Sequence, residues 1–278
     1  MTERAVVASK AVSIIIVSFN ARADLERCLE SLHATPPAAS HEIIVVDNAS
    51  ADGSADAARR WPDVRIIETG ENLGFARANN IGFRASTGAN LLLLNNDTIV
   101  PAGAIDRLLD ELTHHPDVAV VGPRLVGADG RAELSFGRMM GPLNELRQKR
   151  LVRGHERHDP KISALVDQMT RRAHSPVWVS AACLLVRRAD AEAVGLLDER
   201  FRLYTEDVDF CAAIRARGRL VRFTPAVEVI HTRGRSAAAA PAAAREAYRQ
   251  SRLAFYEKHH PFWAPFLRLY LRLRRADR

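Results

Sequence analysis

Short runs of apolar residues alternate with amphipathic segments over about the first 125 residues of the chain. The apolar runs predict strands, and they cover residues 12–18, 42–47, 64–68, 91–94 and 118–123. The intervening segments predict helices near 23–33, 54–61, 75–85 and 104–115. Strands that are apolar throughout and alternate with helices indicate an α/β fold with an open, mostly parallel sheet covered on both faces.

The second half of the chain begins with a polar, basic and weakly periodic stretch, residues 137–175. Such a stretch is typical of a functional lid or a mobile loop, and a solvated helix without a role is an equal alternative. Regular patterns then return. They predict strands at 177–186, 219–224 and 227–231, a helix near 206–217, and an alanine-rich helix after Pro241. We expect one domain over residues 1–236 and a basic helical extension over residues 237–278.

Composition narrows the class of protein. The chain is 47% hydrophobic and 26% charged, as in ordinary globular proteins, and its longest apolar runs, about 7 residues, are too short to span a membrane. Three cysteines without a CxxC pair argue against a disulfide framework and a zinc site. With no signal-peptide pattern at the N-terminus, we expect a cytoplasmic protein.

Candidate chemistry lies where the predicted strands end. The strand 91–94 is followed by Asn95, Asn96 and Asp97, and ligands of open parallel sheets bind beyond such carboxyl ends. The chain has neither the GxGxxG nor the GxxxxGK[ST] phosphate-binding motif. A diphosphate could instead be neutralised by a divalent cation held by these oxygens. The alternative interpretation is a turn or helix cap before Pro101.

Three other sites carry carboxylates or histidine. Asp47 ends the second strand, where it could accept the N3–H of uracil or thymine, or guanine N1–H, or act only as a turn residue. Glu206, Asp207 and Asp209 lie in the first turn of a predicted helix, where the helix dipole favours ionised carboxylates. One of them could serve as a general base, or the group could only stabilise the helix. His231 ends another strand.

Eight segments together resemble the inverting, nucleotide-sugar-dependent glycosyltransferases of family two, which have the GT-A fold, and especially their bacterial rhamnosyltransferase-like members. These segments are VSIIIVSFN, EIIVVDNASADGS, ENLGFARANNIG, LLLLNNDTIV, VAVVGPRL, VWVSAACLLVRR, LLDERFRLYTEDVDF and VIHTRGRS. They follow the family order between about residues 12 and 236. The resemblance implies a Rossmann-like, mostly parallel sheet flanked by helices.

For the donor, the resemblance implies that Asp47 contacts the nucleobase with Asn20 nearby. It also implies that Asn79 and Arg77 line the nucleoside.

For the metal, Asn95–Asn96–Asp97 takes the place of the family's D-x-D motif. Asp97 matches the usual ligand of Mg²⁺ or Mn²⁺, and His231 matches a histidine that completes the site. Asn95 replaces the first acid of the motif, which removes a negative charge and should weaken cation binding.

For the acceptor, Asp207 matches the family's catalytic base. Trp178 and Ser180 would border the acceptor, and Glu206 would contact substrate beside the base. The expected reaction transfers a sugar from a nucleotide-diphosphate donor, with rhamnose from dTDP-rhamnose favoured, to a glycan or lipid-linked saccharide in polysaccharide synthesis. Alternatives are a UDP-hexose or UDP-N-acetylhexosamine donor, or a non-catalytic sugar-nucleotide-binding subunit.

Charge is concentrated at the C-terminal end. Of the net charge of +7, most comes from residues 245–278, where arginines alternate with aromatic and leucine residues. This pattern is typical of an interfacial helix attracted to anionic lipid. It would place the protein at the inner face of the cytoplasmic membrane, beside a lipid-diphosphate-linked acceptor. The alternative is a helix packed on its own domain or in a dimer contact. Nucleic-acid binding is not expected, because the arginines lie at one terminus and no recognition motif is present.

Overall fold

The strands predicted from the apolar runs form one eight-stranded sheet in the computed structural model, which describes residues 10–232 and 241–276. Its order is β3-β2-β1-β4-β9-β6-β10-β5. The bounds are β1 Val12–Ser18, β2 His41–Asp47, β3 Val64–Glu68, β4 Asn90–Asn95, β5 Thr98–Ile99, β6 Val118–Val126, β9 Cys183–Arg187 and β10 Leu220–His231. Neighbouring strands are parallel except at β9, which is antiparallel to β4 and β6, and at β5, which is antiparallel to β10. The prediction of a mostly parallel sheet is confirmed.

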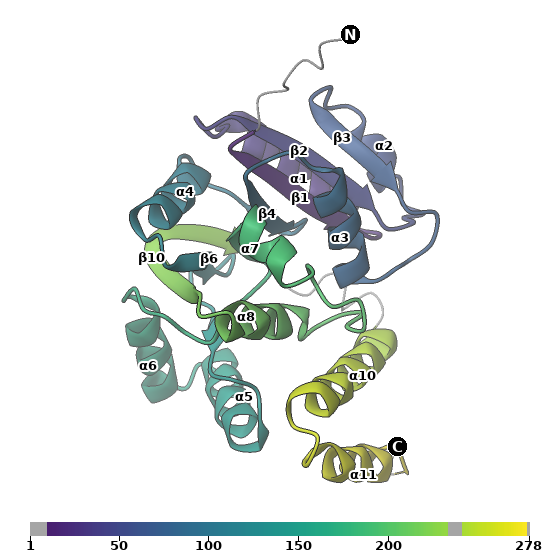
Figure 1. The fold of residues 1–278 in the computed structure, drawn as a ribbon, viewed down its shortest axis with the longest axis vertical. Helices are drawn as coiled ribbons and strands as arrows, with labels where there is room; N and C mark the ends of the chain where they lie inside the picture. The colour runs from purple at the N-terminus through teal and green to yellow at the C-terminus, as the bar shows by residue number, and fades with distance from the viewer. Residues whose placement is uncertain (1–9, 233–240, 277–278) are drawn as a thin grey trace.

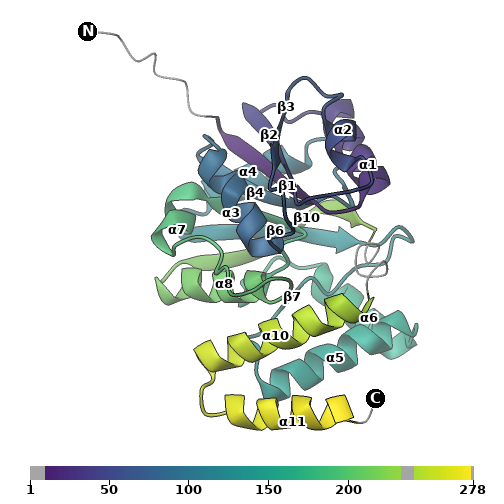
Figure 2. The same cartoon turned by 90° about the vertical axis from the view of Figure 1, so that its right-hand side faces the viewer.

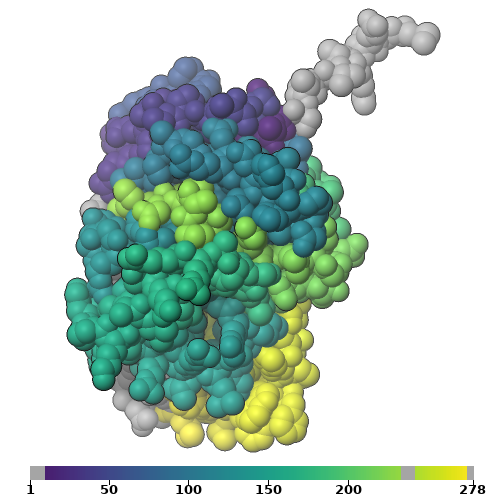
Figure 3. Space-filling view, turned by 90° about the vertical axis from the view of Figure 1, so that its left-hand side faces the viewer, coloured from purple at the N-terminus to yellow at the C-terminus, as the bar shows by residue number. Residues whose placement is uncertain are grey.

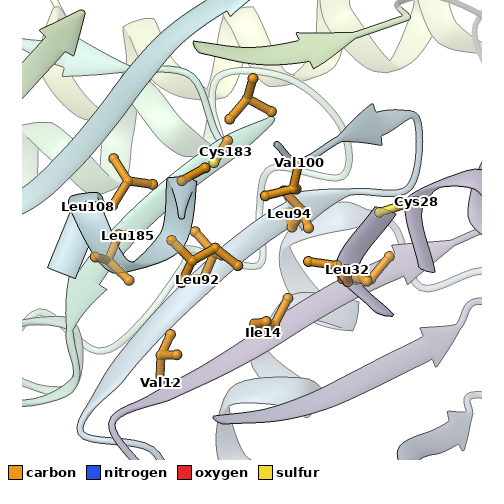
Figure 4. Close-up of a cluster of buried hydrophobic side chains, with 14 of the residues drawn as sticks. Val12, Ile14, Cys28, Leu32, Leu92, Leu94, Val100, Leu108, Cys183 and Leu185 are labelled. Atoms are coloured by element: carbon orange, nitrogen blue, oxygen red, sulfur yellow. The ribbon is translucent and has the colours of Figure 1, made fainter. Parts of the chain in front are cut away.

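Helices cover both faces of this sheet (Figures 1 and 2). On one face lie α1 Arg22–Ala34, α2 Ser54–Ala58 and α4 Ala104–His114. On the other face lie α3 Phe75–Ala85, α7 Arg188–Ala193 and α8 Glu206–Ala216. Successive strand residues point to opposite faces, so Ile14 packs against the first layer and Ile15 against the second. Figure 4 shows the first of these two cores, in which Leu92 and Leu94 lie near Leu32 and Leu185.

The stretch 137–175 is mostly helical, so the interpretation as a mobile loop is wrong and the helical alternative describes its secondary structure. It begins with the end of β7, Phe136–Gly137, and contains α5 Pro142–Glu156 and α6 Pro160–Thr170. Local signals start these helices: each has a proline in its first turn, and the Asp159 side chain accepts hydrogen bonds from two backbone N–H groups of α6. Helical periodicity is weak in the sequence because α5 buries only Glu145 and Leu151, one of them charged.

Two expected strand boundaries also need correction. Residues 177–186 form two strands, because β8, Trp178–Val179, pairs with β7 and only β9 joins the main sheet. The expected pair of strands at 219–224 and 227–231 is one strand, β10, with a shift of register between Thr224 and Glu228. Pro225 lies within that shift, where its missing N–H costs no ladder bond.

The C-terminal end forms α10 Pro241–His259 and α11 Ala264–Ala276, which lie beside α5 below the sheet (Figure 2). A third core joins them to the rest of the protein through Phe255 and Tyr256, which pack with Phe201 and Val208. Among the residues that the structure describes, no helix is both long enough and apolar enough to cross a bilayer.

Candidate active site

A cavity of about 1320 Å³ opens beyond the carboxyl ends of β1 and β4. One wall is the sheet, and the other walls are α5, the N-terminus of α8 and α10. Figure 3 shows α5, α6 and the C-terminal helices adjoining one another at this end of the molecule. The cavity therefore lies where parallel strand ends and helix termini collect, which is the usual ligand site of open α/β sheets.

His231 lies between two carboxylates at the sheet end of the cavity. Its Nε2 is 3.2 Å from Asp97 Oδ1, and its Nδ1 is 3.1 Å from Glu133 Oε2. Burial alone would lower the pKa of His231, but the hydrogen bonds and charges of the two carboxylates outweigh it and raise the pKa to about 9. The amide of Asn95 is 3.5 Å from the same Nε2. Asp97, Asn95 and His231 thus come together as the sequence predicts.

These residues offer a divalent cation a carboxylate oxygen, an amide oxygen and an imidazole nitrogen. That donor set suits Mn²⁺ or Mg²⁺ better than a soft metal. Within the described part of the chain, no group of three or more histidine, cysteine or acidic side chains is arranged to hold an ion. A metal bound here would need further ligands from substrate or water, since Asp97 and His231 supply two.

The N-terminus of α8 brings the candidate base into the same cavity. Asp207 Oδ2 accepts a hydrogen bond from Ala181 N–H at 3.2 Å, and its Oδ1 accepts one from Val208 N–H at 2.8 Å. Burial raises the pKa of the Asp207 carboxyl, and these N–H donors oppose that shift. Ala181 lies in the break between β8 and β9, so its N–H is not used in a strand pairing and can donate to Asp207.

Glu206, beside the base, differs from the expectation of an ionised group. It is buried, and its Oε2 has no hydrogen-bond partner within the described residues. Burial and then the negative charge of Asp207 raise its pKa well above the usual value. Glu206 therefore holds a proton more tightly than a solvent-exposed glutamate does. Asp209 points away and bonds Lys258 and His259 of α10.

None of the four residues expected at the nucleoside is among the residues that line the cavity. Asp47 is buried, its Oδ2 accepts from Ser50 N–H, and its Oδ1 has no partner in the part of the chain that is described. Asn20 lies nearby, with its Oδ1 accepting from Ala51 N–H at 2.8 Å. Neither Asp47 nor Asn20 lines the cavity, and neither do Arg77 and Asn79.

Those two residues have local partners instead. Arg77 is exposed and faces Glu199 at 3.8 Å, while the buried Asn79 amide donates to Phe75 O within α3. Asn48, which the sequence argument did not single out, does line the cavity, and its Oδ1 accepts from Leu73 N–H. Its position next to Asp47 was the available signal.

Trp178 and Ser180, which the resemblance places at the acceptor, both line the cavity. The Trp178 indole donates to Arg138 O at 2.9 Å, and its ring would clash with a Cβ at Gly137, 2.7 Å away. Ser180 N–H donates to Ser135 O. Sequence reasoning missed Glu133 and Ser135, because they lie in a segment with neither a motif nor a periodic pattern.

Comparisons with known proteins agree with this geometry. The family model described as "Glycosyl transferase family 2" matches residues 13–170. An N-acetylglucosaminyl-diphospho-decaprenol L-rhamnosyltransferase of Mycobacterium tuberculosis is 32% identical over 93% of this chain and 88% of its own length. An O-antigen biosynthesis protein, RfbC of Myxococcus xanthus, is 28% identical over 78% of this chain and 17% of its own.

Among solved structures, a mannosyltransferase of Pyrobaculum calidifontis, in complex with GDP-Man and Mn²⁺, has a TM-score of 0.61 at 19% identity. It covers 94% of this chain and 69% of its own. This similarity in fold covers nearly the whole chain, including the part beyond the residues that the family model matches. Because the family match covers more than half of the chain, the protein belongs to glycosyl transferase family 2 and is a glycosyltransferase with the GT-A fold.

Proposed function

We propose that this glycosyltransferase moves rhamnose, with inversion, from dTDP-rhamnose to a lipid-diphosphate-linked saccharide in the synthesis of a cell-surface polysaccharide. The observation that carries the proposal is that Asp207 and the Asp97–His231 pair line one cavity. The name of the mycobacterial relative supplies the sugar and the acceptor class. A UDP-hexose or UDP-N-acetylhexosamine donor is the second candidate, because uracil and thymine present the same N3–H to Asp47.

At the donor end, Asp97 and His231 would hold Mg²⁺ or Mn²⁺, with Asn95 as a neutral helper. When bound, the cation supplies Lewis-acid stabilisation of the leaving nucleoside diphosphate. The unpartnered Oδ1 of Asp47 supports a nucleobase contact, since a buried carboxylate oxygen needs a donor. The Asn20 side chain accepts a hydrogen bond from Ala51 N–H in the loop that follows Asp47. Arg77 and Asn79 lie in α3 and do not line the cavity, so they would influence the nucleoside only indirectly, through the position of that helix.

At the acceptor end, Asp207 takes the proton of the attacking hydroxyl. The hydroxyl oxygen forms a bond to the anomeric carbon while the bond from that carbon to the diphosphate oxygen breaks on the opposite face. The leaving nucleoside diphosphate keeps the electron pair, and the configuration inverts. Trp178, Ser180 and Glu206 would border the acceptor sugar in this arrangement.

The basic C-terminal extension, residues 237–278, would attach the protein to an anionic membrane surface. Supporting this, α11 and the turn before it expose large apolar side chains, namely Phe262, Trp263, Phe266, Leu269, Tyr270 and Leu273. Arginines alternate with them along the helix. Aromatic and leucine side chains next to arginine suit the boundary between headgroups and acyl chains.

Vesicle sedimentation tests the attachment. We expect Phe266→Ser, Leu269→Ser and Leu273→Ser together to reduce binding to phosphatidylglycerol vesicles, while Leu165→Ser on α6, also an exposed leucine, does not. Equal binding by both variants would remove the membrane contact from the proposal.

A thermal-shift screen against dTDP, UDP, GDP and CDP, each with and without Mn²⁺, tests the donor. A ligand that binds only the folded state raises the melting temperature with its occupancy. We expect dTDP with Mn²⁺ to give the largest shift. A larger shift with UDP would favour the second candidate, and no shift with any nucleotide would contradict the donor site.

A further inference from the structure

Two arginines that line the cavity have no ion-pair partner among the described residues. Arg138 follows β7 and Arg147 lies on α5, and both are exposed. Within the described residues, neither guanidinium makes a hydrogen bond or an ion pair, whereas Lys149 on the same wall bonds Glu145. A guanidinium presents a planar fork of donors that matches phosphate oxygens, so these two side chains are suited to a phosphorylated ligand.

Hydrogen bonds join the two segments that carry these arginines. The Asn144 amide donates to Met139 O at 2.9 Å, and the Gln148 amide donates to Phe136 O at 3.1 Å. These bonds tie the backbone on either side of Arg138 to α5. Because positions 144, 147 and 148 share one helix face, Arg147 projects from the face that these bonds bring against the Arg138 segment.

Three buried side-chain oxygens of cavity residues have no hydrogen-bond partner among the described residues. They are Ser135 Oγ, Thr205 Oγ1 and Glu206 Oε2, and their residues all line the cavity. Buried polar groups are nearly always hydrogen-bonded, so three orphans here indicate a ligand rich in hydroxyl groups. The run from Ser135 to Arg138 spans on the order of 10 Å at about 3.3 Å per residue, which leaves room for a short saccharide.

Close to Arg147 in sequence, α5 exposes apolar side chains. Leu143 is 82% exposed and Leu146 is 68% exposed, and both lie within about one turn of Arg147. The cavity and the adjoining surface of α5 therefore hold a general base, hydroxyl-binding groups, two arginines without an ion pair among the described residues, and apolar side chains. A lipid-linked saccharide carries parts that match these groups: sugar, diphosphate and hydrocarbon.

We propose that Arg138 and Arg147 bind the diphosphate that joins the acceptor saccharide to its lipid. The proposal rests on the proposed function for the acceptor class, and it assigns a site that is separate from the donor diphosphate. The donor's diphosphate belongs at Asp97 and His231, at the sheet end of the cavity, while both arginines stand on the walls formed by α5 and the segment after β7.

A direct binding measurement tests the site without depending on catalysis. Farnesyl diphosphate is titrated into the protein by calorimetry in EDTA, so that no metal bridges the anion. We expect Arg138→Ala with Arg147→Ala to weaken binding roughly 10- to 100-fold, because charge-assisted hydrogen bonds are lost. Arg150→Ala, which removes an exposed arginine of α5 that does not line the cavity, should change it less than about twofold. An unchanged affinity in the double variant overturns the proposal.

Two further arms identify the source of the phosphate. Affinity for dTDP or UDP with Mn²⁺ should be unchanged in the double variant, and a parallel loss there would mean that the arginines serve the donor. Binding to phosphatidylglycerol vesicles should also be unchanged, and a loss confined to vesicles would assign the arginines to bulk lipid. Either of these results overturns the proposal.

With acceptors, the double variant should raise KM for a farnesyl-diphosphate-linked saccharide and leave the same saccharide on a neutral alkyl chain unaffected. An equal loss on both would indicate a structural role and would also overturn the proposal. A wild-type protein that binds farnesyl diphosphate through these arginines but transfers no sugar would contradict the proposed function alone.

Discussion

Glu133 lies 98 positions before His231 in the chain, yet its Oε2 is 3.1 Å from His231 Nδ1. Both side chains are buried. A carboxylate on Nδ1 fixes the orientation of the imidazole and leaves Nε2 facing Asp97. If Asp97 and His231 hold a metal, Glu133 would act on that site through its hydrogen bond to His231.

Replacing Glu133 should weaken metal binding. We expect Glu133→Ala to lower the Mn²⁺ affinity of the nucleotide complex roughly 10- to 100-fold, and Glu133→Gln to restore part of the loss, because the amide oxygen still accepts from Nδ1–H. Mn²⁺ titration followed by electron paramagnetic resonance measures this. Glu228→Gln removes an exposed carboxylate of β10, the strand that ends in His231, and serves as the control. An unaltered affinity in Glu133→Ala would refute the positioning role.

Asn95 provides the opposite test, since Asn95→Asp restores a negative charge beside Asp97. If the amide lies at the metal, the substitution should tighten Mn²⁺ binding several-fold and widen activity over low metal concentrations. The same titration reports it. Unchanged affinity would show that this side chain lies outside the field of the ion.

The neighbours Asp207 and Glu206 should respond differently to loss of charge. Asp207→Asn removes the base and should lower kcat about 10²- to 10⁴-fold, with nucleotide binding nearly intact. Glu206→Gln imitates a protonated glutamate and should keep kcat within a few-fold. Because burial raises the pKa of Asp207, wild-type kcat should fall with acid at a pH above the usual aspartate range. Near wild-type turnover in Asp207→Asn would disprove the assignment.

Glu206 also makes stability depend on pH. The folded protein keeps the Glu206 proton at pH values where the unfolded chain has lost it, because its folded-state pKa is raised. The folded state then binds more protons, so this contribution to stability is lost as pH rises from about 4.3 through the raised pKa. The difference in melting temperature between Glu206→Gln and wild type should therefore shift in favour of the variant as the pH rises from about 5 to about 8. A constant difference across that range would contradict the shift.

The attachment of α10 can be tested by unfolding in urea. Tyr256 donates to Glu145 at 2.6 Å, and Phe255 is fully buried in the third core. Tyr256→Phe should cost about 1–3 kcal/mol, because Glu145 loses a buried donor, and Phe255→Ala about 3–5 kcal/mol. Glu257→Gln, in the same helix and exposed, should be close to neutral. Losses below 0.5 kcal/mol in both variants would mean that the extension is only loosely joined.

Local pattern sufficed for much of the fold and for part of the site. Strands such as β1 and β4 could be predicted because residues buried on both faces are apolar throughout. Asp97 could be found because it lies just after the end of an apolar strand, and Asp207 because it lies in the first turn of a helix within a segment that resembles the family. The helix α5 could not be predicted in this way, because one of its buried residues, Glu145, is charged. Its carboxylate forms ion pairs with Lys149, one turn along α5, and with Arg252 of α10, and it accepts a hydrogen bond from Tyr256 of α10.

The sequence by itself therefore determined the layers of the protein, the strand ends that carry its candidate chemistry, and its family. Those features follow from burial and spacing, which are written in consecutive residues. Only the tertiary structure decided which groups meet: Glu133 with His231, Ala181 N–H with Asp207, and Arg138 with the cavity face of α5. Each contact depends on how distant segments pack, and neither residue of such a pair carries a local signal of the other.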